Sequence, residues 1–307
     1  MSLKIQITFV VFLLATVAGH SLRPVQNFEY AVKDTARLTM DVYSPDGVKR
    51  NTPCLIFVFG GGFFTGSKTE ETNVGFCKAM ADSGFVVAAI DYRLGMKGVK
   101  KRGLAIVPHL LRSVSMAVED LYSATNYLIR HAGELNIDTS RIVISGSSAG
   151  AITALQADYE LNNGMKRSKV LPPGFRYGGV ISFAGGVLSR EWKPDYRKSP
   201  APTLFFHGTG DKIVNYKKVQ LLWFGLFGSD VLSERFKKKG YSYTMIRFSG
   251  IGHEICYLPM LNNRKEVCSF IRRAVVKNIP VSEDETFDGS GLPRVSYGDQ
   301  NLQDLYK

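Results

Sequence analysis

Residues 141–152 read RIVISGSSAGAI, and the rest of the chain is best interpreted around them. The apolar run at residues 142–144 is typical of a strand buried on both faces. Residues 146–150, GSSAG, fit the pattern G-x-S-x-G, which places a serine on a tight turn between a strand and a helix. The stretch therefore predicts a strand that runs through a strained turn directly into a helix.

Three serines compete for that turn, but only Ser148 has glycine at both flanking positions. The glycines leave room where the turn crowds the neighbouring backbone. The next residue, Ala149, would offer its backbone N–H to a developing oxyanion at the positive end of the helix. A nucleophilic Ser148 is one interpretation, and a plain Gly/Ser turn without chemistry is the other.

The amino terminus differs from the rest of the chain. Lys4 precedes an apolar run at residues 5–18, and the small residues at 17–19 resemble a cleavage site. The run is too short for a membrane span, which needs about 20 apolar residues. We interpret residues 1–19 as a secretory signal peptide, which predicts a secreted or periplasmic protein. A buried amino-terminal element is the alternative.

Charge and cysteine content restrict the partners. The formal charge of +12 comes from scattered basic residues without interleaved aromatic residues, so we expect neither nucleic acid nor a stable membrane association. Weak attraction to anionic surfaces is the minor alternative.

In an exported chain the four cysteines could form two disulfides. Their spacing leaves the pairing of Cys54, Cys77, Cys256 and Cys268 open.

Strand and helix patterns alternate along the chain. Residues 27–32 and 37–44 predict an antiparallel hairpin with its turn near Asp34, and residues 95–108 predict a loop. The remaining expected strands are 54–59, 85–90, 178–183, 203–206 and 241–248, and the expected helices are 71–83, 113–132 and 263–277. This alternation predicts an α/β fold with a mostly parallel sheet covered by helices on both faces. We assign residues 20–281 to a single domain and expect a loose tail at residues 282–307.

A serine nucleophile needs a base, and the base needs a carboxylate to orient it. His253 follows the last expected strand, and Asp211 follows the strand before it, in HGTGDKIV at residues 207–214. By its local sequence alone Asp211 would instead be the N-cap of a helix. The order Ser148, Asp211, His253 is that of the G-x-S-x-G hydrolases. His207 precedes the acid, so we expect it to fix a turn and to act mainly through stability.

These motifs make the chain resemble the α/β-hydrolase superfamily, from about residue 28 to residue 276. FGGGFFTGS at residues 59–67 resembles the H-G-G-G-F…G-S loop of the carboxylesterase and hormone-sensitive-lipase-like branch, with Phe59 in place of the histidine. The resemblance implies that Gly61 and Gly62 donate backbone N–H groups to the oxyanion, together with Ala149. It also implies a structural role for Arg93, in the element DYRL at residues 91–94.

The resemblance implies a serine carboxylic-ester hydrolase for short-chain acyl esters, with Phe63 and Phe64 at the rim of the acyl pocket. Exported members of the branch suggest acetyl or feruloyl groups on carbohydrate as substrates. A peptidase of the prolyl-oligopeptidase kind and a catalytically silent binding protein are the alternatives. The residue spacing predicts no metal site and no nucleotide cofactor. The oligomeric state cannot be inferred from the sequence.

Overall fold

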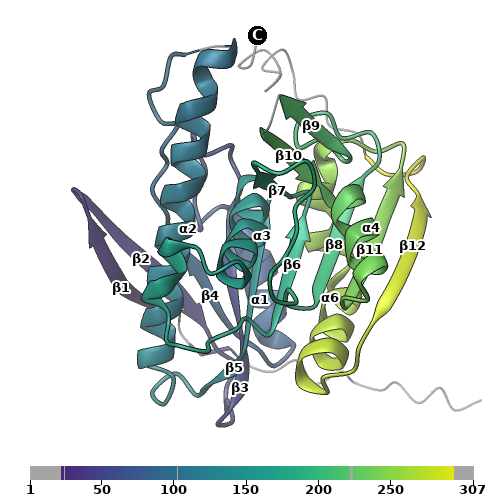
Figure 1. Cartoon of the computed structure of the whole chain (residues 1–307). Helices are drawn as coiled ribbons and strands as arrows, with labels where there is room; N and C mark the ends of the chain where they lie inside the picture. The colour runs from purple at the N-terminus through teal and green to yellow at the C-terminus, as the bar shows by residue number, and fades with distance from the viewer. Residues whose placement is uncertain (1–21, 24, 102, 222–223, 294–307) are drawn as a thin grey trace, which may run out of the picture.

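The computed structural model describes residues 22–293 except residues 24, 102, 222 and 223. A nine-stranded sheet crosses the molecule in the order β1-β2-β4-β3-β5-β6-β8-β11-β12 (Figure 1). The pairs β1/β2 and β2/β4 are antiparallel and the other neighbours are parallel. The predicted α/β class with a mostly parallel central sheet is confirmed.

The strands are β1 (Gln26–Lys33), β2 (Ala36–Tyr43), β3 (Thr52–Val58), β4 (Val86–Ile90), β5 (Ile137–Ser147), β6 (Gly179–Phe183), β7 (Gly186–Ser189), β8 (Thr203–Gly208), β9 (Lys218–Leu221), β10 (Phe224–Gly228), β11 (Tyr243–Ser249) and β12 (Ser282–Asp288). The α-helices are α1 (Glu71–Asp82), α2 (Val107–Arg130), α3 (Ala149–Asn162), α4 (Ser229–Lys239), α5 (Leu258–Asn262) and α6 (Arg264–Phe270). Short helical turns are η1 (Gly103–Ile106), η2 (Lys166–Val170), η3 (His253–Cys256) and η4 (Ile271–Val276).

Helices cover both faces of this sheet. α3 packs on β5 and β6 and against α2, whereas α1 packs on β4 with α5 and α6 beside it. Every residue of β4, β6 and β8 is buried, which explains their continuous apolar sequences. Parallel strands place their carboxyl ends at one edge of the sheet, so residues that follow β3, β5, β8 and β11 lie close together.

The carboxyl-terminal prediction is wrong for residues 282–288. These residues form β12, which pairs in parallel with β11 at the edge of the sheet. Asp284 accepts hydrogen bonds from the Tyr243 hydroxyl at 2.6 Å and from the Arg247 guanidinium at 2.7 Å. An edge strand exposes most of its side chains, so an acidic sequence is compatible with it. The expected tail beyond residue 293 and the expected signal peptide lie outside the described residues.

Two further features differ from the predictions. Part of the loop expected at residues 95–108 is helical, because η1 leads into α2 at Val107, and Pro108 is tolerated in the first helical turn. A second sheet, in the order β7-β10-β9, was not predicted. Its strands are only four or five residues long, and it lies beyond the ends of β6 and β8 at the top of Figure 1.

Side-chain contacts settle two smaller points. Arg93 forms ion pairs with Asp34, Glu119 and Asp120, which confirms its structural role. The four cysteines form no disulfide: Cys54, Cys77 and Cys268 are buried thiols, and Cys256 is partly exposed. The helices of the described residues were also compared with the requirements of a membrane span. Within the described part of the chain, no helix has the length and apolar character needed to cross a membrane.

Candidate active site

Ser148 lies at the junction of β5 and α3. Its φ of 50° and ψ of −115° are strained for a residue with a side chain, as expected for a serine lifted out of the sheet on a sharp turn. Its backbone N–H donates to the Phe183 carbonyl on the neighbouring strand β6, which holds the turn in place. Ser145 instead is fully buried and donates to the Ile56 carbonyl, so its hydroxyl has a structural partner.

The two glycines of this turn are required by close packing. A side chain at Gly150 would collide with the Val58 carbonyl of β3, and one at Gly146 would collide with the backbone of Gly150. Both positions therefore let the first turn of α3 lie directly against β3 and β5. This packing places the amino end of α3 and the Ala149 N–H beside the Ser148 hydroxyl, since the first N–H groups of a helix have no intrahelical acceptor.

The structure brings Ser148, His253 and Asp211 together. The Ser148 hydroxyl is 2.8 Å from His253 Nε2, and His253 Nδ1 is 2.7 Å from Asp211 Oδ2. Asp211 follows β8 and His253 follows β11, so the parallel pairing of these strands brings residues 42 positions apart into contact. All three side chains are buried, which strengthens hydrogen bonds between them.

The electrostatics suit a base held by an ionised acid. Burial would raise the pKa of the Asp211 carboxyl, but hydrogen bonds from His207 and His253 outweigh burial and lower it to about 2. Burial would lower the pKa of His253, yet the neighbouring Cys256 and Asp211 raise it above its ordinary value. Asp211 is therefore ionised near neutral pH and stabilises the imidazolium that forms when His253 accepts a proton.

The glycine loop after β3 lies beside Ser148. A side chain added at Gly60 would contact the Ser147 carbonyl and Ser148 Cβ at 3.1 and 3.4 Å. Gly61 and Gly62 have positive φ values of 110° and 62°, and the Gly61 carbonyl accepts hydrogen bonds from the N–H groups of Phe64 and Thr65. The loop is therefore a tight turn that only glycine adopts easily at Gly61.

Aromatic residues pack against this loop. Phe59 stands where related loops have histidine, and its ring lies 4.5 Å from that of Tyr92, centroid to centroid. The Tyr92 hydroxyl donates to the Phe59 carbonyl at 3.1 Å. Phe63 is only 1% exposed and meets Tyr92 edge to face, so it belongs to the core and not to an open pocket rim. Of the predicted pair only Phe64 is partly exposed.

Two neighbours of the triad were not predicted. His207 lies 3.3 Å from Asp211 Oδ2, the oxygen that also faces His253, and Cys256 lies in the same short helical turn, η3, as His253. The spacing H-G-x-x-D contained a signal for the first contact, since His207 and Asp211 are four residues apart across one turn. No sequence pattern indicated Cys256.

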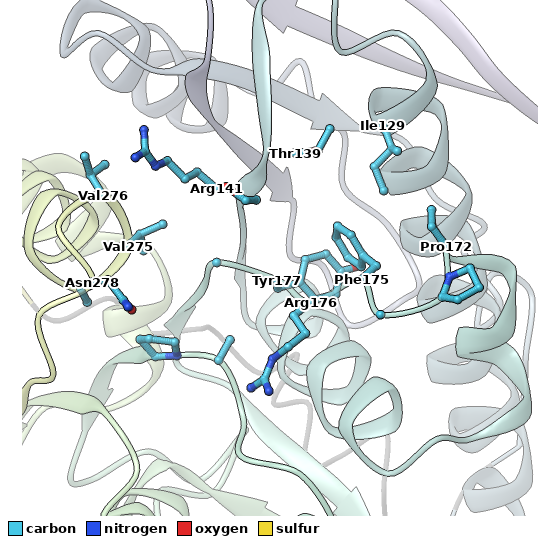
Figure 2. Close-up of a pocket in the computed structure, with 17 residues that line it drawn as sticks. Ile129, Thr139, Arg141, Pro172, Phe175, Arg176, Tyr177, Val275, Val276 and Asn278 are labelled. Carbon is cyan, nitrogen blue, oxygen red and sulfur yellow. The ribbon is translucent and has the colours of Figure 1, made fainter.

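A hollow in the described part of the chain lies away from the triad. It has a volume of about 780 Å³ and is lined by Arg141, Arg176, Tyr177 and Val275 among others (Figure 2). Residues 178 and 202 in its wall precede β6 and β8, so it lies at the amino ends of the parallel strands, opposite the edge that carries Ser148. Across the residues that the structure describes, no group of histidine, cysteine and acidic side chains is arranged to hold a metal ion.

Comparison with known proteins agrees with the α/β-hydrolase fold that the sheet order and the strand–turn–helix serine define. A Phospholipase/Carboxylesterase family model matches residues 106–271, more than half of the 307-residue chain and a span that contains all three triad residues. The chain belongs to this phospholipase/carboxylesterase family. A BD-FAE family model also matches residues 40–170, which include the glycine loop and Ser148.

Individual relatives align over shorter stretches. Gut esterase 1 of Caenorhabditis briggsae is 29% identical over 119 residues, 39% of this chain and 20% of that protein. Carboxylesterase NlhH of Mycobacterium tuberculosis is 30% identical over 117 residues, 38% of this chain and 32% of that protein. The match therefore spans a third or less of these relatives.

A solved structure resembles the chain over a greater length. Thermogutta terrifontis esterase 2, phosphoramylated by tabun, superimposes with a TM-score of 0.60 at 22% identity and covers 81% of this chain and 94% of that chain. At this identity the similarity shows the fold.

Proposed function

We propose that the chain is a serine carboxylic-ester hydrolase. The observation that carries the proposal is the hydrogen-bonded series Ser148, His253 and Asp211, with distances of 2.8 and 2.7 Å, at the amino end of α3. Nucleophile, base and orienting acid within hydrogen-bond reach are the arrangement that acyl transfer requires.

The reaction follows from these contacts. His253 Nε2 accepts the proton of Ser148 as the hydroxyl oxygen attacks the ester carbonyl. The Ala149 N–H and the N–H groups of Gly61 and Gly62 stabilise the oxyanion, and His253 then returns the proton to the leaving alcohol. Water attacks the acyl-enzyme by the same route in reverse order, which releases the carboxylic acid and restores Ser148.

We further propose short acyl groups as substrates. Esterase 2 of Thermogutta terrifontis, which shares this fold, has been solved with propionate bound and with butyrate bound. Phe63 is buried and Phe64 only partly exposed, which supports a small acyl site beside the glycine loop. Acetyl or feruloyl groups on carbohydrate are the natural esters that we propose within this range.

A labelling experiment tests the catalytic assignment. An organophosphonate should modify wild-type protein at Ser148, whereas Ser148→Ala should take up no label and lose about 10⁴-fold or more in kcat. Ser147→Ala is the matched control and should still be labelled. Wild-type protein that takes up no label would identify a silent binding protein and contradict the proposal.

A substrate panel tests the specificity. The panel contains nitrophenyl esters from acetate to palmitate, acetylated xylan, methyl ferulate and a prolyl amide. We expect kcat/KM to be highest for the short esters, because a small site gains little from added methylenes. A rate that climbs steadily to long chains would indicate a lipase, and cleavage of the prolyl amide in preference to esters would indicate a peptidase.

We also propose that residues 1–19 direct export, on the pattern of Lys4, the apolar run and the small residues at 17–19. Amino-terminal sequencing of the protein recovered outside the cytoplasm should begin at residue 20. Protein retained in the cytoplasm with residue 1 or 2 at its amino terminus would refute export.

A further inference from the structure

His207 is a buried titratable side chain that the mechanism above does not use. It is the penultimate residue of β8 and has no exposed surface. Four residues later the chain reaches Asp211, and the carboxylate of Asp211 lies 3.3 Å from His207 Nε2. A histidine buried this deeply against the acid of the candidate triad calls for a physical explanation.

The partners of His207 determine where its proton lies. Nε2 is 2.9 Å from the Val214 carbonyl and 3.3 Å from Asp211 Oδ2. Both of these oxygens can only accept a hydrogen bond while Asp211 is ionised, so Nε2 must carry a proton. In the neutral ring Nδ1 then accepts a hydrogen bond from the Ser229 hydroxyl at 2.7 Å. Both ring nitrogens therefore have defined partners.

The carboxylate of Asp211 is surrounded by donors. Its Oδ1 accepts the backbone N–H groups of Ile213 at 2.9 Å and Val214 at 3.1 Å. Its Oδ2 lies between His253 Nδ1 and His207 Nε2. A carboxylate held on both oxygens cannot rotate away from His253 without losing other hydrogen bonds, and such charge-assisted bonds are the strong ones.

The backbone places these groups with little freedom. A side chain at Gly208 would collide with the carbonyls of Ile251 and Gly252, so the end of β8 is packed directly against the loop that leads to His253. The ring of His207 also meets Tyr216 edge to face at 5.5 Å, and Tyr216 accepts a hydrogen bond from Arg247. The imidazole is thus fixed by packing as well as by hydrogen bonds.

We propose that His207 is a positioning residue for the hydrolysis: its Nε2–H donates to Asp211 Oδ2 and to the Val214 carbonyl, and so holds the carboxylate in the orientation that aligns His253 with Ser148. The inference rests on the proposed function of the triad. It assigns His207 a role beyond the stability role expected from the sequence.

Two amide variants separate this role from simple packing. The Nε2 of glutamine is as many bonds from Cβ as Nε2 of histidine, whereas Nδ2 of asparagine corresponds to Nδ1. His207→Gln can therefore still donate to Asp211, and His207→Asn can reach only the Ser229 side. His131→Gln, at a partly exposed histidine that stacks on Tyr127, is the matched control.

The measurement is kcat per serine titrated by phosphonate, with KM and the melting temperature recorded for each variant. We expect His207→Asn to lose about 10-fold or more in kcat with KM nearly unchanged, and His207→Gln to stay within about threefold of wild type. Equal kcat for both folded variants, at the wild-type value or below it, would overturn the inference.

A spectroscopic measurement covers the case in which the asparagine variant does not fold or the protein proves not to be an esterase. The downfield proton resonance of the His253–Asp211 hydrogen bond should be kept in His207→Gln and weakened or shifted in Ser229→Ala, which removes the partner that orients the ring. An unchanged resonance in Ser229→Ala together with its loss in His207→Gln would contradict the role. Failure of the proposed function itself would appear separately, as wild-type protein without phosphonate label.

Discussion

At the scale of single residues, the site depends on how burial and charge compete at His253. Burial favours the neutral imidazole, but Cys256 and Asp211 together favour the imidazolium and raise the pKa of His253 above 6.5. A base must be neutral to accept a proton, so a raised pKa means that activity requires a higher pH. Cys256 therefore contributes to a higher pH requirement for activity, because it raises the pKa of His253.

The first prediction concerns this pH dependence. kcat/KM should rise with pH along a limb whose midpoint lies above the ordinary histidine pKa of 6.5, because His253 must lose its proton. Cys256→Ser should move that limb to lower pH, since one of the causes of the raised pKa is removed. Initial rates across the pH range measure both effects. A flat profile from roughly pH 5 to 8, with chemistry rate-limiting, would contradict a histidine base.

The second prediction concerns Gly61. Its φ of 110° disfavours a side chain, and a Cβ there would collide with the carbonyl of Thr65, whose N–H donates to the Gly61 carbonyl in the same turn. Gly61→Ala should therefore displace the oxyanion donors and lower kcat by about 10²-fold. Gly47→Ala is the control, because Gly47 also has positive φ but open space around it. A similar small effect of both changes on kcat would show that the Gly61 turn is not part of the oxyanion site.

At the scale of elements, the contact between α3 and the sheet decides where Ser148 lies. α3 follows the nucleophile directly, so any outward shift of the helix moves both the serine and the Ala149 N–H. Gly150 allows the approach, because its missing side chain leaves room for the backbone of β3. The close contact is thus a condition for the site and not only for stability.

Two helical glycines test this statement. Gly150→Ala should destabilise the protein and lower kcat, because the added methyl group collides with the Val58 carbonyl. Gly75→Ala, in α1, meets nothing within 4 Å and should stabilise the fold by about 0.5 to 1 kcal/mol without changing kcat. Chemical denaturation and steady-state rates on the same samples measure both effects. A Gly150→Ala protein as stable and active as Gly75→Ala would disprove the close-packing explanation.

At the scale of the whole molecule, one buried acid on α3, Asp158, couples folding to pH. Asp158 is fully buried, and burial raises its pKa to about 7 despite hydrogen bonds from the Ala201 N–H and the Asn162 amide and the charge of Arg176. The folded protein therefore holds a proton that the unfolded chain releases near pH 4. Stability should fall as the pH rises from about 4 to about 7, by on the order of 4 kcal/mol from this group alone.

The corresponding prediction compares wild type with Asp158→Asn. The variant lacks the titrating group, so its stability should not show this dependence on pH. The melting temperature of wild type should therefore exceed that of the variant by more at pH 5 than at pH 8. Glu285→Gln, at an exposed carboxyl on β12, controls for the change in net charge. Scanning calorimetry at both pH values measures the difference. A difference independent of pH would show that Asp158 does not bind the extra proton.

Much of the site follows from local sequence. The apolar run before G-x-S-x-G predicted the strand, the turn and the helix around Ser148, because each of these depends on residues next to one another in the chain. The resemblance to the α/β-hydrolase order of serine, acid and histidine selected Asp211 and His253, and this order brings them together because parallel strands end at the same edge of a sheet. The glycine loop was recognisable by its resemblance to the H-G-G-G-F…G-S motif, and the positive φ values of Gly61 and Gly62 explain why glycine suits these positions.

Other features depend on contacts between distant segments, which sequence patterns do not contain. The acidic residues of β12 form a strand by pairing in parallel with β11, where Tyr243 and Arg247 also donate hydrogen bonds to Asp284. The small sheet β7-β10-β9 consists of strands too short to leave a periodic pattern. His207 and Asp211 are only four residues apart, and His253 and Cys256 only three, but these side chains meet because of the turn that follows β8 and because of the helical turn η3. Local residues thus determined the chemistry of the site, whereas tertiary packing decided which side chains surround it.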